Sequence, residues 1–351
     1  MGIFDFGKIP IYSLDISDQS FKFLRLTQNS FGEVVIVDFG EGAIDKGVIE
    51  NGEIKDKRRL SELLKEVFLK NNIKFIALSL PEEKGFLREI KISGVTEKDL
   101  AGTLEFQIEE HIPLPAADIF FEYTVTGKGN DFFELVVNAF PRNIVESYLE
   151  VVSSSGVLPT IVESEIESVA RSIVPRGFLK TAMIVDWGKT RVSFSIFEKG
   201  VLRFVSTALF GGEILDNSIS KGLGISKSEA VKVKTKTDIF DHNTSPQTLN
   251  VVLPVITNFL EEIQKILGYW LSRSGTNTKV DQIFLSGGDS NLFGLPEYLQ
   301  KELDIPVSLA NPWVNAKFPS KYLPSIKFKD SLRFSSVIGL SLKVMESEKI
   351  L

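Results

Sequence analysis

Two aspartates, Asp15 and Asp186, stand at the ends of apolar stretches, where a carboxylate can take part in chemistry. Each follows a short buried strand and precedes a polar turn and a second strand with alternating apolar residues. The carboxylate therefore projects at the mouth of a hairpin turn. In the second hairpin Gly188 lets the backbone approach a ligand closely, because glycine has no Cβ. The same pattern in each half of the chain indicates an internal duplication, and two such lobes can close around a ligand.

The first half of the chain predicts the elements that position Asp15. Residues 11–39 predict three strands, and Leu60–Leu69 places its apolar residues on one helical face. A buried strand over Phe75–Leu80 follows. Strands and a helix in this order predict an α/β half-domain.

The second half repeats this organisation around Asp186. The hairpin at 181–201 leads into a third strand, and Gly211-Gly212 then introduces a helix. After a long helix over Leu249–Leu271, a strand ends at Gly287-Gly288. These elements predict a second α/β lobe.

Residues 84–158 differ from both halves. Their pattern predicts a β-α-β-β-α unit with its own apolar faces, in which prolines end the first helix. We therefore predict an inserted subdomain. The expected segments are a first lobe at 1–83, the insert at 84–158, a return to the first lobe at 159–180, a second lobe at 181–330, and a closing helix packed on the first lobe at 331–351.

The composition excludes several classes of protein. A length of 351 residues favours two or more domains, since single cores rarely exceed about 250–300 residues. A net charge of −6 argues against a general nucleic-acid surface. The absence of cysteine excludes disulfides and thiolate metal sites, and two histidines are too few for a histidine metal cluster. The sequence shows no signal peptide at its start and no apolar run long enough for a membrane helix.

Several motifs in chain order carry a resemblance to a known family. They read LDISDQSFKFLRL, FQIEEHIPLPAADIFFEY, IVDWGKTRVSFSIF, FGGEILDNSISKGLGISKSEA, IFLSGGDSNLFGLPEYLQKELDIPVSLANPW and SSVIGLSLKV. The chain resembles the PilM family of actin-like type IV pilus assembly proteins over nearly its whole length. This resemblance implies the actin-like, ribonuclease H-like duplicated fold, with two lobes and an inserted 1C-type subdomain.

The resemblance also implies a nucleotide cleft, in which the two hairpins hold phosphates and magnesium. Asp15 and Asp186 would act on the metal indirectly, through Mg²⁺ that arrives with a nucleotide. The matching nucleotide-binding positions are Asp15, Ser17, Ser20, Lys22, Asp186, Gly188, Lys189, Thr190, Gly211, Gly212, Lys234, Gly287 and Gly288. No general base for water can be identified, so at most a weak ATPase is expected.

Three positions depart from the family pattern. Ser17 replaces a glycine, and Asp18 replaces a serine and adds a negative charge. Val231 replaces the glutamate that would accept the ribose hydroxyl bonds. ATP with Mg²⁺ is the implied cofactor, and these departures predict weak or absent binding. Alternatively, the aspartates and glycines that match the family pattern only shape turns that the fold requires.

The partner implied by the resemblance is a PilN-like inner-membrane protein, bound through its short cytoplasmic N-terminal peptide. The chain would then be a cytoplasmic scaffold of the type IV pilus or a related type II secretion-like complex, peripheral at the inner membrane through its partners. Peptide recognition needs an apolar groove or an exposed strand edge. Candidate contact residues in the insert are Phe106, Ile112, Pro113, Leu114 and Phe121. If they are only core, their truncation should unfold the insert.

Two other classes of function stay open at this point. One is an FtsA-like cell-division or cytoskeletal protein, although little chain follows the closing helix to form an amphipathic anchor. A GspL-like secretion protein is a related possibility, although the lack of a membrane span argues against a full-length GspL. The other is an ATP-dependent sugar or small-molecule kinase of the same fold, against which the IPLP segment and the lack of an evident catalytic aspartate argue.

Overall fold

The computed structural model describes residues 9–236, 238, 244–273 and 278–347. The chain divides into two compact units. The first contains residues 1–172, 313–325 and 336–351, and the second contains 173–312 and 326–335.

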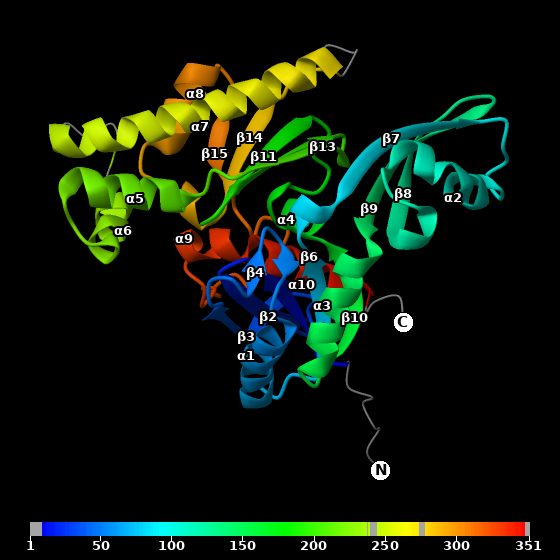
Figure 1. Ribbon diagram of the computed structural model, residues 1–351, viewed down its shortest axis with the longest axis horizontal. Helices are drawn as coiled ribbons and strands as arrows, with labels where there is room; N and C mark the ends of the chain where they lie inside the picture. The colour runs from blue at the N-terminus through cyan, green and yellow to red at the C-terminus, as the bar shows by residue number, and fades with distance from the viewer. Residues whose placement is uncertain (1–8, 237, 239–243, 274–277, 348–351) are drawn as a thin grey trace. The chain divides into compact units, whose positions relative to one another are not determined.

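The first unit is built on a five-stranded sheet with the order β10-β6-β1-β2-β3. Figure 1 labels β2, β3, β6 and β10 of this sheet. These strands are β1 (Ile11–Ile16), β2 (Ser20–Gln28), β3 (Val34–Ala43), β6 (Phe75–Leu80) and β10 (Leu158–Ser164). β1 pairs antiparallel with β2 and parallel with β6, so Asp15 lies near the end of a central strand. β2 and β3 extend the antiparallel side, and β10 adds a parallel strand beyond β6.

Helices α1 (Lys57–Lys70) and α3 (Arg142–Ser154) share one core with this sheet. The side chain of Asp56 caps α1 by accepting a hydrogen bond from the Arg59 N–H, which satisfies one of the free donors at the start of the helix. The short hairpin of β4 (Ile49–Glu50) and β5 (Glu53–Ile54) leads into α1.

Helices α4 (Glu165–Ile173) and α10 (Ser335–Ser347) approach each other at Gly339. A Cβ placed on Gly339 would lie 1.7 Å from the backbone oxygen of Ser168. Only glycine permits this distance between the two helices.

The insert forms its own three-stranded sheet with the order β7-β9-β8. Its elements are β7 (Phe86–Ser93), α2 (Leu100–His111), β8 (Ile119–Lys128) and β9 (Phe132–Pro141), with one-turn helices η1 (Glu82–Lys84) and η2 (Ala116–Asp118) nearby. Leucine and isoleucine side chains of α2 pack against one face of this sheet. The strands of the insert are therefore separate from the five-stranded sheet, as the sequence predicts. α3, which follows β9, contributes its apolar side chains to the core of the five-stranded sheet.

The second unit repeats the strand plan of the first. Its sheet has the order β13-β12-β11-β14-β15, from β11 (Thr181–Trp187), β12 (Val192–Glu198), β13 (Val201–Ala208), β14 (Gln282–Ser286) and β15 (Val307–Leu309). The first strand again pairs antiparallel with the second and parallel with the fourth. This matching topology confirms the predicted duplication.

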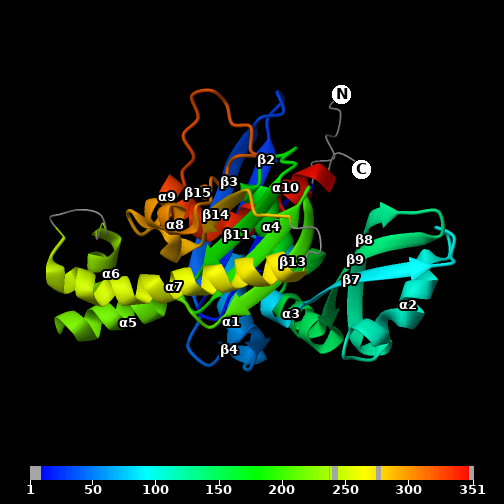
Figure 2. The same cartoon turned by 90° about the horizontal axis from the view of Figure 1, so that it is seen from above.

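Helices α5 (Gly212–Leu223) and α7 (Pro246–Arg273) lie side by side and contribute to the core of this unit (Figure 2). Trp187 at the end of β11 stacks on Phe259 of α7, with ring centroids 4.1 Å apart. The remaining helices are α6 (Lys227–Lys236), α8 (Leu295–Leu303) and α9 (Phe328–Ser331), with a short η3 (Gly288–Ser290) after β14. Within the described ranges, no helix is both long and apolar enough to cross a membrane.

Candidate functional site

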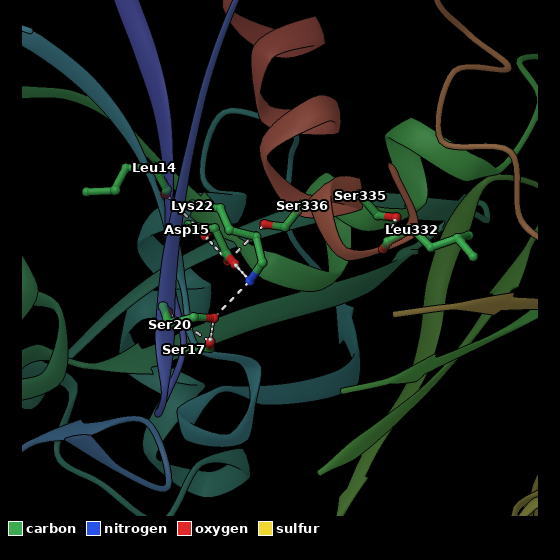
Figure 3. A network of polar contacts seen from close by, with 9 residues as sticks. Leu14, Asp15, Ser17, Ser20, Lys22, Leu332, Ser335 and Ser336 are labelled. Atoms are coloured by element: carbon green, nitrogen blue, oxygen red, sulfur yellow. Dashed lines mark hydrogen bonds and ion pairs between the residues drawn. The ribbon is translucent and has the colours of Figure 1, made fainter. Parts of the chain in front are cut away.

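The first hairpin holds Asp15 in a buried polar network (Figure 3). Its Oδ1 accepts hydrogen bonds from the hydroxyl groups of Ser79, at 2.7 Å, and of Ser336, at 3.1 Å. The network therefore joins β1, β6 and α10 of the first unit. These donors satisfy the hydrogen-bonding capacity of one oxygen of a carboxylate that is almost completely removed from solvent.

Lys22 and the turn serines complete this network. The Lys22 Nζ lies 4.0 Å from Asp15 Oδ2 and donates a hydrogen bond to the Ser20 hydroxyl at 3.1 Å. Ser17 donates both its N–H and its hydroxyl to the Ser20 carbonyl, each at 2.9 Å. All four residues that the sequence predicts for this hairpin thus come together, and they bind one another.

Asp18 has a structural partner. Its Oδ1 accepts a hydrogen bond from the Gly52 N–H at 3.0 Å, and Gly52 has a φ of +71° in the turn between β4 and β5. The sequence predicts Asp18 as an added charge that weakens anion binding. The structure adds that this carboxylate connects two turns of the first unit.

The second hairpin packs directly on the start of α5. The N–H of Gly212 donates to the Gly188 carbonyl, and the N–H of Glu213 donates to the Lys189 carbonyl, both at 2.9 Å. A Cβ on Gly211 would lie 2.3 Å from backbone atoms of Lys189 and Thr190. The turn and the glycine pair are therefore in contact, and two N–H groups at the start of α5 are used by the turn itself.

Asp186 lies beside the glycine pair that follows β14. A Cβ on Gly287 would lie 2.7 Å from Asp186 Oδ1 and 2.3 Å from the backbone oxygen of Trp187. Gly287 also has a φ of +85°, which disfavours any side chain. Gly288 continues this turn into η3. The second unit thus brings together its predicted aspartate and both predicted glycine pairs.

A buried ion-pair network lies next to these glycines. The Lys234 Nζ contacts Asp216 Oδ1 at 2.6 Å and also binds Asp289, while Lys189 pairs with Asp216. The side chains of Asp216 and Lys234 are only 3% and 8% exposed. Burial alone would disfavour the charged amine, but the carboxylates of Asp289 and Asp216 raise the pKa of Lys234. Two lysines therefore face two aspartates, and the network has no excess positive charge.

Asp216 and Asp289 were not predicted from the sequence. Asp216 stands one helical turn after Gly212, and Asp289 directly follows Gly288. Their positions beside the two predicted glycine pairs were the available signal. A Cβ on Gly212 would lie 2.0 Å from the Asp289 carboxyl carbon, so this carboxylate rests directly on the start of α5.

The predicted contact residues of the insert fall into two groups. Ile112 is 1% exposed and belongs to the core of the insert, with Leu114 and Phe121 packed partly against it. Phe106 is 89% exposed on α2, and Pro113 is also exposed. Ile112 is therefore a core residue, and an aspartate at this position would be buried among apolar side chains at a large cost in stability.

The outer strand β8 carries further exposed apolar residues. Phe120, Tyr123 and Val125 are 41%, 36% and 44% exposed. Arg142 lies over the Phe120 ring, 4.0 Å from its centroid. β8 pairs with β9 on one side and is the last strand of its sheet on the other. β7, the outer strand at the opposite edge, exposes Glu89, Lys91 and Ser93 instead.

Comparisons with known proteins agree with this fold. The model of the family described as "Type IV pilus assembly protein PilM" matches residues 13–345. The chain belongs to this family. It is thus an actin-like protein of type IV pilus assembly.

Solved structures show the same fold at low sequence identity. One described as "PilM-PilN type IV pilus biogenesis complex" has a TM-score of 0.78 and 16% identity, covering 97% of this chain and 99% of that one. MreB5 of Spiroplasma citri bound to ADP has a TM-score of 0.58 and 14% identity, with 97% and 98% covered. The ethanolamine utilization protein EutJ from Carboxydothermus hydrogenoformans has a TM-score of 0.56 and 14% identity, with 94% and 88% covered.

Proposed function

We propose that this chain is a scaffold of the pilus assembly complex that binds the N-terminal peptide of a PilN-like inner-membrane protein. It would act in the cytoplasm and reach the inner membrane through that partner. Family membership supports the proposal, as does the resemblance in fold to the chain of a PilM-PilN complex.

The observation that carries the proposal is the composition of the outer strand β8. An outer strand offers unpaired backbone groups to an added peptide strand, and proteins usually protect such an edge with charged residues. β8 exposes the apolar side chains of Phe120, Tyr123 and Val125 beside the charged Glu122. The partner peptide would extend the sheet of the insert along β8 and cover these side chains.

A peptide titration tests this placement. The N-terminal peptide of the PilN-like protein from the same source, labelled with a fluorophore, is titrated with the full chain and followed by fluorescence anisotropy. Tyr123→Asp and Val125→Asp each place a charge against the bound peptide, and we expect each to raise Kd at least tenfold. Because both side chains are partly exposed, the thermal midpoint should change little.

Phe106→Asp is the matched control, since Phe106 is exposed on α2 and lies outside β8. We expect this variant to bind as tightly as the wild type. Loss of binding in Phe106→Asp with normal binding in the β8 variants would move the site to the helix and proline segment predicted from the sequence. No binding by the wild-type chain would contradict the proposed partner.

A second proposal concerns nucleotide. MreB5, a fold relative, was solved with ADP, and this chain retains both aspartate hairpins of the fold. We propose that its affinity for ATP with Mg²⁺ is weak or absent. In the first unit the hairpin groups bind one another, and in the second Lys234 is neutralised by Asp216 and Asp289.

A further inference from the structure

Gly52, in the turn between β4 and β5, contacts several parts of the first unit. It is buried and has a φ of +71°, which favours glycine. Its N–H donates a hydrogen bond to Asp18 Oδ1 at 3.0 Å, and its carbonyl accepts one from the Tyr148 hydroxyl at 3.1 Å. One residue therefore connects the first hairpin, which carries Asp18, with α3, which carries Tyr148.

The chain enters the insert across this turn, through the segment between β6 of the five-stranded sheet and β7 of the insert. A Cβ on Gly52 would lie 2.8 Å from the carboxyl carbon of Glu83 and 2.9 Å from the Cβ of Pro81, both in this segment. The segment thus packs on the Gly52 backbone so closely that a side chain at position 52 would displace it.

The chain leaves the insert through β9 and α3. Tyr148 is completely buried on α3 and belongs to the core of the five-stranded sheet, where its hydroxyl binds Gly52. Phe140, near the end of β9, lies 3.1 Å from where a Cβ on Gly85 would stand, so the leaving strand also touches the entering segment. Both connections of the insert therefore contact each other and the Gly52 turn.

The first hairpin supports this turn through Asp18. The residues on both sides of Asp18 are held by backbone contacts: the Ser17 N–H donates to the Ser20 carbonyl, and the Ile44 N–H donates to the Gln19 carbonyl, both at 2.9 Å. Asp18 also stands where the family pattern has a serine. A carboxylate accepts a stronger hydrogen bond than a neutral hydroxyl does, so this departure strengthens the contact with the turn.

We propose that Asp18, Gly52 and Tyr148 form a latch that fixes the insert relative to the five-stranded sheet. Hinge motion requires a few residues between two elements to change their backbone angles, and here the residues at both connections pack on the latch. A change that separates Asp18 from Gly52 would therefore release the insert. This inference goes beyond the proposed function, because it holds whatever partner the insert binds.

A distance measurement between the sheet and the insert tests the latch. The chain contains no cysteine, so two introduced cysteines are the only sites for a thiol-directed spin label. Glu66→Cys on α1 and Glu105→Cys on α2 place these labels at exposed positions of the full chain. Double electron–electron resonance then gives the distribution of the distance between them. We expect one narrow distribution, which becomes about twofold wider when Asp18→Ala is added.

Asp18→Asn is the matched variant, because its amide oxygen can still accept the hydrogen bond from Gly52. It should keep the narrow distribution. Tyr148→Phe retains the buried ring and removes only the hydroxyl, so it should widen the distribution. Asp45→Ala is the control, since Asp45 is exposed and pairs with Arg59 on the surface of the same unit, and it should change nothing.

An unchanged distribution in an Asp18→Ala variant that is folded by circular dichroism would overturn the latch. If that variant does not fold, an unchanged distribution in Tyr148→Phe has the same meaning. Equal widening in Asp18→Asn and Asp18→Ala would overturn the role of the hydrogen bond. No measurement here involves a peptide, so failure of the PilN-like peptide to bind would contradict the proposed function and leave this inference in place.

Discussion

At the scale of single residues, Lys234 matches the family's nucleotide-binding pattern but forms ion pairs within its own unit. It is buried between Asp216 and Asp289 and forms ion pairs with both. Replacing one partner of a buried network leaves the other charges uncompensated. The structure therefore gives this lysine a stabilising role that does not require a ligand.

We expect Lys234→Met to lower the free energy of unfolding by about 3–5 kcal/mol, because two aspartates lose their shared cation. Denaturant unfolding followed by circular dichroism measures this change. Lys232→Met, on the exposed side of the same helix, is the matched control and should stay within about 0.5 kcal/mol of the wild type. Equal stability of the two variants would show that the network contributes nothing.

Glu82 makes stability depend on pH. Burial, followed by the charge of Glu167, raises its folded-state pKa from 4.5 to about 8, so the folded chain holds a proton that the unfolded chain releases between these values. Stability from this group is therefore present below about pH 4.5 and is lost as pH rises toward 8. Glu82→Gln, which imitates the protonated form, should remove this contribution, which is at most about 1.4 kcal/mol per pH unit.

Denaturant melts at pH 5, 6, 7 and 8 check this expectation. The stability difference between Glu82→Gln and the wild type should increase with pH in favour of the variant. Glu66→Gln, at an exposed position on α1, should give a curve parallel to that of the wild type. A parallel curve for Glu82→Gln as well would contradict the raised pKa.

At the scale of elements, the crossing of α4 and α10 depends on Gly339. Its backbone lies so close to the Ser168 carbonyl that an added Cβ would overlap it. We expect Gly339→Ala to separate the helices and to lower the thermal midpoint strongly, although alanine favours the helical state by about 1 kcal/mol. Differential scanning calorimetry measures this shift.

Gly268→Ala is the control for this prediction. Gly268 also lies within a helix, α7, but a Cβ there meets no atom within 4 Å. This variant should be as stable as the wild type or more stable, by up to about 1 kcal/mol. If Gly339→Ala had the same thermal midpoint as Gly268→Ala, the two helices could adjust to the added Cβ without a loss of stability.

At the scale of the whole molecule, each of the two units carries positions that match the nucleotide-binding pattern of the family. In each unit the structure shows the predicted residues engaged with neighbours of the same unit. We expect isothermal titration with ATP and Mg²⁺ to give weak or no binding. A submicromolar Kd for the wild type would contradict this expectation.

Variants can locate the cause of this weak binding. Val231→Glu restores the family residue at a position that is 37% exposed, so it should be tolerated. Asp18→Ser changes two things at once, because it removes both a negative charge and the hydrogen bond from the Gly52 N–H. If loss of the ribose contact is the cause, Val231→Glu alone should tighten ATP binding.

The sequence by itself determined the duplicated fold, the separate sheet of the insert and the two aspartate hairpins. These features follow from local patterns: strand alternation, glycine pairs after strands, and prolines that end a helix. β10 escaped prediction because Leu158 and Thr160 are exposed and Pro159 interrupts the strand pattern, so its pairing with β6 shows only in the folded chain.

Only the tertiary structure decided what the polar residues bind. Asp216 and Asp289 lie far apart in the sequence and meet at Lys234, and Asp18 and Tyr148 likewise meet at Gly52. The burial of Ile112 and the exposure of β8 were likewise decided by packing. Periodicity along the chain reports which face of an element is apolar, whereas long-range packing sets which charges share a neighbourhood and which strand forms the edge of a sheet.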